Sequence, residues 1–177
     1  MPVSRSTAPF NTDGGIHEIP LPAAVGRLWL CGKHHIAPDP EAVRARHGID
    51  TVVCLVEEHE LAGRYDSYVQ WHRDNAGGAG LWFPLEDITY PHFDDAIGFV
   101  TDVATRVRDS SSVLVHCAAG IGRAGTTAVA VCMILGMERF EAMDHVRMHR
   151  PMAGPEAGSQ HDFIEALEIH LSGGNDY

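Results

Sequence analysis

Lysine is almost absent from this sequence, and positive charge is scarce as a whole. Lys33 is the only lysine, and 13 Lys and Arg residues stand against 24 Asp and Glu, which gives a formal net charge of −11. A surface with this charge repels nucleic acid and anionic membranes, because both are polyanions. We therefore expect neither nucleic acid nor a membrane as a partner.

Long apolar runs and paired cysteines are also missing. The longest apolar run, at 128–137, is too short to cross a bilayer, and the N-terminus lacks the charged start and apolar core of a signal peptide. The cysteines form no CxxC pair and are Cys31, Cys54, Cys117 and Cys132. These absences disfavour a disulfide scaffold and predict a cytoplasmic protein in a reducing compartment.

Apolar segments with strand spacing alternate with segments of helical spacing along most of the chain, whose length suits one domain with a full core. Strands are expected at 27–31, 51–56, 81–85 and 113–115, and helices at 39–46, 61–75, 93–107, 137–149 and 159–171, besides one after residue 123. The alternation predicts a three-layer α/β fold with a central, mostly parallel sheet of about four to five strands flanked by helices. We expect an irregular N-terminal arm at 1–22, a single domain at 23–172 and a loose tail at 173–177.

An acidic run follows the second predicted strand, and a set of aromatic residues follows the run. Acidic runs are typical of a solvated surface, whereas aromatic residues at helical spacing are typical of core packing. The acidic residues are Glu57, Glu58 and Glu60. The aromatic residues are Tyr65, Tyr68 and Trp71.

The segment 112–137 has the pattern of an anion site. Apolar β-branched residues predict a buried strand, two glycines predict a tight loop, and an Ala- and Val-rich run predicts a buried helix. Loop N–H groups and the first helical turn then face one point, where the helix dipole favours negative charge. Arg123 at the end of the loop can bind two phosphate oxygens, and the same field stabilises a thiolate at Cys117, where the loop begins.

The loop residues form the pattern HCxxGxGR, from His116 and Cys117 through Gly120 and Gly122 to Arg123. This pattern resembles the signature of the cysteine-dependent protein tyrosine phosphatase superfamily, dual-specificity type. The letters PLEDITYP at 84–91 look most like the group that includes the cyclin-dependent-kinase-associated phosphatase. The resemblance implies hydrolysis of phosphate monoesters (phosphotyrosine, and phosphoserine or phosphothreonine, in proteins) through a phosphocysteine intermediate. It implies no cofactor, and as partner a phosphorylated protein or a small phosphate monoester.

The same resemblance implies a role for each residue of the site. Cys117 is expected to be the nucleophile, Arg123 a phosphate ligand, and Asp87 the general acid that protonates the leaving oxygen. Glu86 and Asp94 are the substitutes for Asp87. The phosphate-binding loop is expected to consist of Ala118, Ala119, Gly120, Ile121, Gly122 and Arg123.

Three further positions have supporting roles in this resemblance. His116 is expected to tune the thiolate from beneath the loop without transferring a proton. Gln160 is similar to a residue that orients the hydrolytic water in relatives, with a polar position on a surface helix as the alternative. Cys54 is similar to a second cysteine that forms a disulfide with the oxidised nucleophile, with an inert buried thiol as the alternative.

Ala124 departs from the family pattern, which has Ser or Thr directly after the arginine, with a hydroxyl that hydrogen-bonds the cysteine sulfur. Its absence is expected to slow breakdown of the phosphocysteine, unless Thr126 or Thr127 supplies the hydroxyl. The loop also has no lysine, unlike that of phosphoinositide phosphatases, which favours a monophosphate ester. Two alternatives stay open: a phosphate-binding pseudophosphatase with little turnover, and a rhodanese- or arsenate-reductase-like enzyme with a similar cysteine loop.

Histidine is plentiful but scattered. His145 and His149 share one helix face at a spacing that can bind a metal ion. No third ligand is near them in the sequence, so we expect no metal site.

Overall fold

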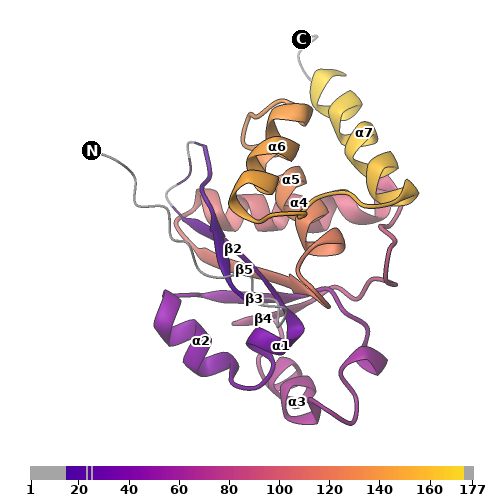
Figure 1. The fold of residues 1–177 in the computed structure, drawn as a ribbon. Helices are drawn as coiled ribbons and strands as arrows, with labels where there is room; N and C mark the ends of the chain where they lie inside the picture. The colour runs from indigo at the N-terminus through magenta and orange to yellow at the C-terminus, as the bar shows by residue number, and fades with distance from the viewer. Residues whose placement is uncertain (1–14, 23, 25, 174–177) are drawn as a thin grey trace.

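The computed structural model describes residues 15–22, 24 and 26–173, and its elements form three layers (Figure 1). The strands of the described part are β1 (His17–Ile19), β2 (Arg27–Gly32), β3 (Thr51–Cys54), β4 (Gly80–Trp82) and β5 (Ser112–Cys117). Its helices are α1 (Lys33–Ile36), α2 (Pro40–His47), α3 (Asp66–Asp74), α4 (Phe93–Arg108), α5 (Gly122–Ile134), α6 (Arg139–His149) and α7 (Gly158–Gly173), with a 3-10 helix η1 (Glu58–Glu60). Helices α4 to α7 lie on one face of the sheet and α1 to α3 on the other (Figure 1). The predicted three-layer α/β fold is confirmed.

The sheet has the strand order β1-β2-β5-β3-β4, and β1 alone is antiparallel to its neighbour. Central β5 is buried along its whole length, as a parallel strand covered on both faces should be. Because β2, β3 and β5 are parallel, their carboxyl ends meet at one edge. The register there places Cys31 and Cys54 on either side of His116, and Gly32 beside Cys117.

The expectation of an irregular arm at 1–22 is wrong at residues 17–19, which form β1, while residues 1–14 lie outside the described part. A three-residue strand is too short to give a period-2 pattern, and β1 exists because it pairs with the edge of β2. The short helix α1, which directly follows β2, was not predicted either.

Other elements differ from the prediction in their bounds. The predicted helix at 61–75 begins only at Asp66, because Gly63 adopts φ +79 and interrupts the helical path. The strands predicted at 51–56 and 81–85 end earlier, at Cys54 and Trp82. The helix predicted at 39–46 is α2, and Asp39 is its N-cap, whose carboxylate accepts a hydrogen bond from Ala42 N at 2.9 Å.

Helix α5 is the centre of the helical layer that covers β5. Every residue from Gly122 to Met133 is buried, and the helix packs against α4, α6, α7 and the sheet. A helix enclosed on all sides is apolar all round, which explains its Ala- and Val-rich sequence. The start of α5 is therefore fixed tightly relative to the end of β5.

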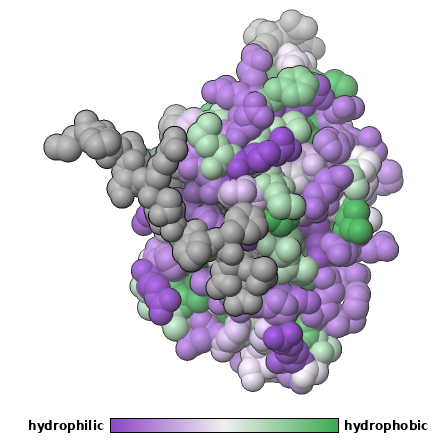
Figure 2. Space-filling model, in the orientation of Figure 1, coloured by the Kyte–Doolittle hydropathy of each residue, from purple (hydrophilic) through white to green (hydrophobic). Residues whose placement is uncertain are grey.

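The face of the molecule seen in Figure 2 is mostly hydrophilic over its described residues, with apolar side chains scattered among polar ones. Large exposed apolar side chains are Ile88, Phe140, Met148, Met152, Ile169 and Leu171. No helix of the described part is long and apolar enough to cross a membrane.

Candidate active site

The residues from Cys117 to Arg123, called the phosphate loop below, connect β5 to the N-terminus of α5. Cys117 is 3% exposed and Arg123 is 1% exposed. The loop lies at the sheet edge where three parallel strands end, which is where α/β folds bind their ligands. The structure thus places the predicted cysteine, glycines and arginine in one site.

Each backbone carbonyl from Cys117 to Ile121 accepts a hydrogen bond from a group outside the turn that the loop makes. Cys117 O accepts from His116 Nδ1 (3.2 Å), and Ala118 O accepts from Lys33 N (3.0 Å). Ala119 O and Gly120 O accept from Arg150 Nη2 (2.9 Å) and Nε (2.7 Å). Ile121 O accepts from both Gly125 N (3.0 Å) and Gly154 N (3.1 Å). The C=O and N–H of one trans peptide point in opposite directions. The N–H groups of residues 118–122 are therefore turned toward the other side, where they could bind an anion.

Both glycines of the loop are required by close contacts. Gly120 has φ +71, and a Cβ atom there would lie 2.3 Å from the carbonyl oxygen of Cys31. A Cβ atom on Gly122 would lie 2.1 Å from Oε2 of Glu156. Only glycine lets the loop pack this closely on β2 and on the segment before α7.

Arg150 is a site residue that the sequence reasoning missed. The residue is 4% exposed, and its guanidinium binds the carbonyls of Ala119 and Gly120 and also contacts Gly15 O and His17 Nδ1 (2.7 Å). Burial lowers the pKa of Arg150 from its ordinary value. A single arginine at the end of an ordinary helix has no motif around it, so the sequence holds no signal for this role.

Arg123 is held by an ion pair on one side and has a free donor on the other. Its Nη1 and Nη2 bind the carboxylate of Glu60 at 2.8 and 2.9 Å, and Nη1 also donates to Leu85 O at 2.8 Å. Burial opposes the charge, but the hydrogen bonds to Glu60 raise the pKa of Arg123. Its Nε is buried and has no partner among the described residues. This N–H is a donor that an oxygen of a bound phosphate can satisfy.

The interpretation of the acidic run as solvated surface is wrong for Glu60. Its side chain is 14% exposed and pairs with Arg123, whereas Glu58 pairs with Arg73 at the surface. Burial raises the pKa of the Glu60 carboxyl, and the hydrogen bonds from Arg123 outweigh it and leave the pKa below its usual value. The long separation between Glu60 and Arg123 in the chain explains why the sequence does not reveal the pair.

The segment 85–91, called the acid loop below, brings Asp87 to the same site. Asp87 Oδ1 lies 3.2 Å from Arg123 Nη2, and its side chain is 67% exposed. Of the three candidate acids, Asp87 is the one with this contact among the described residues, while Asp94 lies in the first turn of α4. Ile88 next to it adopts φ 64, a left-handed conformation that is uncommon for a β-branched residue.

The acid loop is attached at both ends. Leu85 N donates to Leu55 O at 2.9 Å, Tyr90 N donates to the hydroxyl of Ser159 at 3.0 Å, and the Tyr90 hydroxyl contacts Thr127 Oγ1 at 2.8 Å. Gln160, predicted near the hydrolytic water, is fully buried beside this second attachment. Its Oε1 accepts from Glu156 N at 2.8 Å, and its Nε2 donates to Thr89 O at 3.5 Å.

The residues near Ala124 do not place a hydroxyl on the cysteine sulfur. Thr127 Oγ1 donates to Arg123 O at 3.0 Å and contacts Tyr90, so its hydroxyl is engaged elsewhere. Thr126 Oγ1 is buried without a partner among the described residues. Ala124 itself is fully buried.

Cys54 lies next to the site, as its position in β3 predicts. It pairs with His116 in the register, and its thiol lies 3.8 Å from Val56 O. Burial raises the pKa of the Cys54 thiol to about 12. Cys31 is placed in the same way on the opposite side of His116, where burial also raises its pKa. The sequence reasoning did not single out Cys31.

His145 and His149, whose spacing can bind a metal ion, each contact a backbone carbonyl in the structure. His145 Nε2 lies 2.6 Å from Pro20 O, and His149 Nδ1 lies 2.8 Å from His145 O. Both contacts are hydrogen bonds to backbone carbonyls.

The site has a cysteine and an arginine at the two ends of one loop, at the carboxyl edge of a five-stranded sheet. This arrangement is typical of cysteine phosphatases. A sequence profile described as "PTP-SAK: Swiss Army Knife protein, DSP-PTPase phosphatase domain" matches residues 30–161. The chain belongs to this family of DSP-PTPase phosphatase domains.

Individual relatives agree with the family. Dual specificity protein phosphatase 1 of Arabidopsis thaliana is 40% identical over 78 residues, which are 44% of this chain and 36% of the relative. Dual specificity protein phosphatase 5 of Homo sapiens is 37% identical over 82 residues, 44% of this chain and 21% of the relative. The matched part is thus about a third or less of these relatives.

Solved structures show the same fold. The active form of Tk-PTP is 31% identical with a TM-score of 0.65, over 84% of this chain and 97% of that one. A kinase associated phosphatase whose catalytic-site cysteine is changed to serine has a TM-score of 0.72 at 17% identity, over 92% of this chain and 98% of that one. The second likeness is evidence for the fold alone.

Proposed function

We propose that this chain hydrolyses phosphate monoesters, among them phosphotyrosine and phosphoserine or phosphothreonine in proteins, through a phosphocysteine at Cys117. The observation that supports this most strongly is the phosphate loop, whose carbonyls all bind donors outside the turn. Its amides and the free Nε of Arg123 then remain for the oxygens of a phosphoryl group.

In the proposed mechanism the reaction has two steps. The Cys117 thiolate attacks phosphorus, the bond to the leaving oxygen breaks, and Asp87 gives its proton to that oxygen. Water then attacks the phosphocysteine, Asp87 takes a proton from the water, and phosphate leaves while the thiolate re-forms. Arg123 and the loop amides stabilise the equatorial oxygens in both steps. Gln160, buried beside the acid loop, is proposed to orient the water.

The charges around the site support a monophosphate substrate. The loop interior has no basic residue besides Arg123, and the whole chain has a net charge of −11. Glu156 also places a carboxylate oxygen next to Gly122. A substrate with several phosphates would be repelled here, whereas one phosphate on a neutral or basic segment of protein would not.

The competing proposal is a phosphate-binding protein with little turnover, which Ala124 alone favours. Steady-state hydrolysis of p-nitrophenyl phosphate, followed by a panel of phosphopeptides, separates the two. We expect turnover with the wild type, and none with Cys117→Ser, which lacks the nucleophile. Cys117→Ser should still bind tungstate or inorganic phosphate, because the anion site consists of backbone amides and Arg123. Substantial turnover by Cys117→Ser would disprove the covalent mechanism.

We also propose that Cys54 protects the oxidised nucleophile. Peroxide converts the Cys117 thiolate to a sulfenic acid, and the Cys54 thiol displaces water from it to form a disulfide. The adjacent positions of β3 and β5 support this pair, although the raised pKa of Cys54 slows its reaction.

Mild peroxide followed by dithiothreitol tests the disulfide. The wild type should recover its activity, with a Cys54–Cys117 peptide pair found by mass spectrometry, whereas Cys54→Ser should not recover. Cys31→Ser is the matched control, because Cys31 flanks His116 in the same way from β2. Loss of recovery in Cys31→Ser instead would assign the protective role to the other strand.

A further inference from the structure

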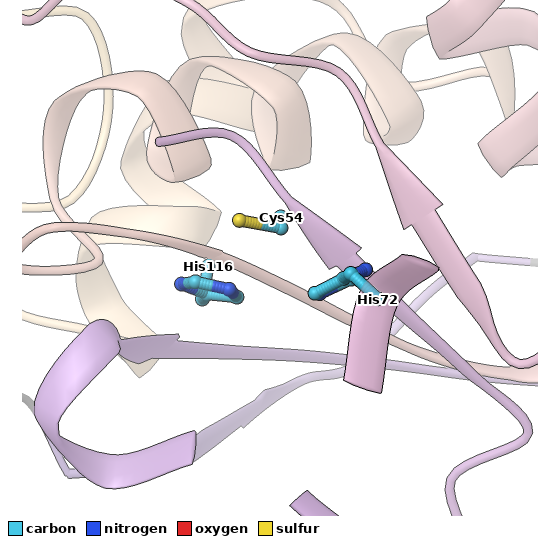
Figure 3. Close-up of side chains that lie close together, drawn as sticks. All are labelled: Cys54, His72 and His116. Carbon is cyan, nitrogen blue, oxygen red and sulfur yellow. The ribbon is translucent and has the colours of Figure 1, made fainter. Parts of the chain in front are cut away.

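A chain of buried hydrogen bonds runs from helix α3 to the first residue of the phosphate loop. Figure 3 shows Cys54, His72 and His116 close together, and their ligand-type atoms lie within 4.8 Å of one another. The hydroxyl of Tyr68 contacts both imidazoles, at 3.0 Å from His72 Nε2 and 2.7 Å from His116 Nε2. His116 Nδ1 in turn lies 3.2 Å from the carbonyl oxygen of Cys117.

The position of each proton in this chain follows from its last atom. A carbonyl oxygen only accepts hydrogen bonds, so His116 Nδ1 has the proton. Burial lowers the pKa of His116 to about 3, and the imidazole is neutral, so its Nε2 has a lone pair. The hydroxyl of Tyr68 therefore donates to His116 Nε2.

The same reasoning fixes the proton of His72. Because the Tyr68 hydroxyl has already used its proton, its oxygen accepts from His72 Nε2–H. Burial lowers the pKa of His72 to about 4, so this imidazole is neutral as well and its lone pair is on Nδ1. That atom is buried without a partner among the described residues, and a Cβ atom on Gly80 would lie 3.0 Å from it.

We infer that His72 and Tyr68 are positioning residues, which act through His116 to hold the first peptide of the phosphate loop in its anion-binding orientation. The opposite tautomer of His116 would aim a lone pair at the Cys117 carbonyl and its Nε2–H at the Tyr68 oxygen. His72 opposes that state, because its Nδ1 faces no acceptor among the described residues and its proton therefore stays on Nε2, which would leave the Tyr68 O–H without an acceptor. With the carbonyl held, the N–H of Ala118 points into the anion site.

Among the donors that hold the loop carbonyls, His116 is the one whose donor atom depends on a tautomer. The others are backbone N–H groups or the guanidinium of Arg150, which have fixed protons. The proton of His116 can be on either ring nitrogen, and His72 and Tyr68 thus favour its position on Nδ1. A metal ion held by Cys54, His72 and His116 is the competing use of these atoms, and it would have to displace the hydroxyl from at least one imidazole.

The direct test is the tautomer of His116 and His72, measured by long-range ¹H–¹⁵N NMR in the wild type and in Cys117→Ser. We expect the proton on Nδ1 of His116 and on Nε2 of His72 in both proteins, and a mixture of tautomers at His116 in His72→Phe. A proton on Nε2 of His116 in the wild type overturns the inference. So does tight one-to-one binding of zinc that His72→Phe and Cys54→Ser abolish.

Kinetics test the effect on the site. His72→Phe is expected to lower kcat/KM about three- to tenfold, which is the effect of one lost hydrogen bond, and to weaken tungstate binding in the Cys117→Ser background by the same factor. Tyr68→Phe should have an equal or larger effect. His72→Gln should recover most of the loss, because its amide N–H can donate to Tyr68. Tyr65→Phe is the matched control, since it removes another tyrosine–histidine hydrogen bond (2.7 Å, to His34) and should stay within about twofold.

The double variant distinguishes a chain from two separate effects. If His72 acts through Tyr68, the Tyr68→Phe, His72→Phe double variant loses no more than Tyr68→Phe alone. Additive losses would overturn the inference. The inference rests on the proposed function, but the two fail separately. A protein without phosphatase activity that shows the expected tautomers and tungstate effects refutes only the function, and an active enzyme with the opposite His116 tautomer refutes only the inference.

Discussion

The phosphate loop and the acid loop meet at Arg123 but are built in opposite ways. The phosphate loop has a partner for each carbonyl from Cys117 to Ile121, and its ends belong to a buried strand and a buried helix. The acid loop is attached near Leu85 and Tyr90, while Asp87 between them is 67% exposed. Two loops of the same site thus differ in how completely the protein determines their backbone.

The difference matches what each loop has to do in the proposed reaction. Binding of an oxyanion by backbone amides gains most when the amides are already oriented, because no reorganisation is then needed. A proton donor has to reach leaving groups of different shapes, so a loop with few backbone bonds to the rest of the protein between its ends serves it better. In the present structure Asp87 contacts Arg123 itself, and a bound phosphate would compete with it for that guanidinium.

The largest effect is expected from removing the proton donor of the acid loop. Asp87→Asn is expected to lower turnover by about 10²-fold or more on phosphates with poor leaving groups, the usual contribution of a general acid. On p-nitrophenyl phosphate the loss should be smaller, because that leaving group needs less protonation. Glu86→Gln is the control for its neighbouring charge. Equal losses by Asp87→Asn on both substrates would mean that Asp87 is structural.

A smaller effect is expected from weakening the ion pair that holds Arg123 at the end of the phosphate loop. Glu60→Gln is expected to lower kcat/KM about tenfold with every leaving group, because the charge-assisted bonds that orient the guanidinium are weakened. Glu58→Gln removes a similar ion pair, to Arg73, at the surface of the same 3-10 helix and should have little effect. A loss that depended on the leaving group would instead connect Glu60 to the acid.

The smallest effect is expected where a hydroxyl is added directly after the phosphate loop, in the first turn of α5. If the missing hydroxyl at position 124 limits breakdown of the phosphocysteine, the wild type shows a burst of product equal to the enzyme concentration. Ala124→Ser should then raise the steady rate a few-fold, about the value of one hydrogen bond, with the burst rate nearly unchanged. Ala128→Ser, one turn further along α5, is the control for a buried hydroxyl. An unchanged steady rate in Ala124→Ser would mean that another group already has this role.

The parts of the site that the sequence predicted are those with a local pattern. The strand, the glycines and the helix between Ser112 and Ile134 are contiguous, so their order alone indicates an anion site. Most elements of the sheet could be predicted for the same reason, since each is a short apolar run between turns. Their bounds were less predictable, because a single glycine such as Gly63 shifts where a helix begins.

The parts that the sequence did not reveal are partners separated by long stretches of chain. Glu60 and Arg123 are 63 positions apart, and Tyr68 and His116 are 48 positions apart. The acidic run predicted that Glu60 is on the surface, and the helical spacing of the aromatic residues predicted that Tyr68 is in the core. The ring of Tyr68 is buried as expected, but its hydroxyl has a polar role that spacing alone does not indicate.

The contact between Arg150 and the start of the described chain bears on how small an active fragment can be. A fragment that began at Arg27 would retain every residue with a proposed chemical role. It would nevertheless lose Gly15 and His17, which accept hydrogen bonds from the guanidinium that orients Ala119 and Gly120. The shortest unit that keeps all these Arg150 contacts therefore includes β1, although that strand has no proposed role in the chemistry.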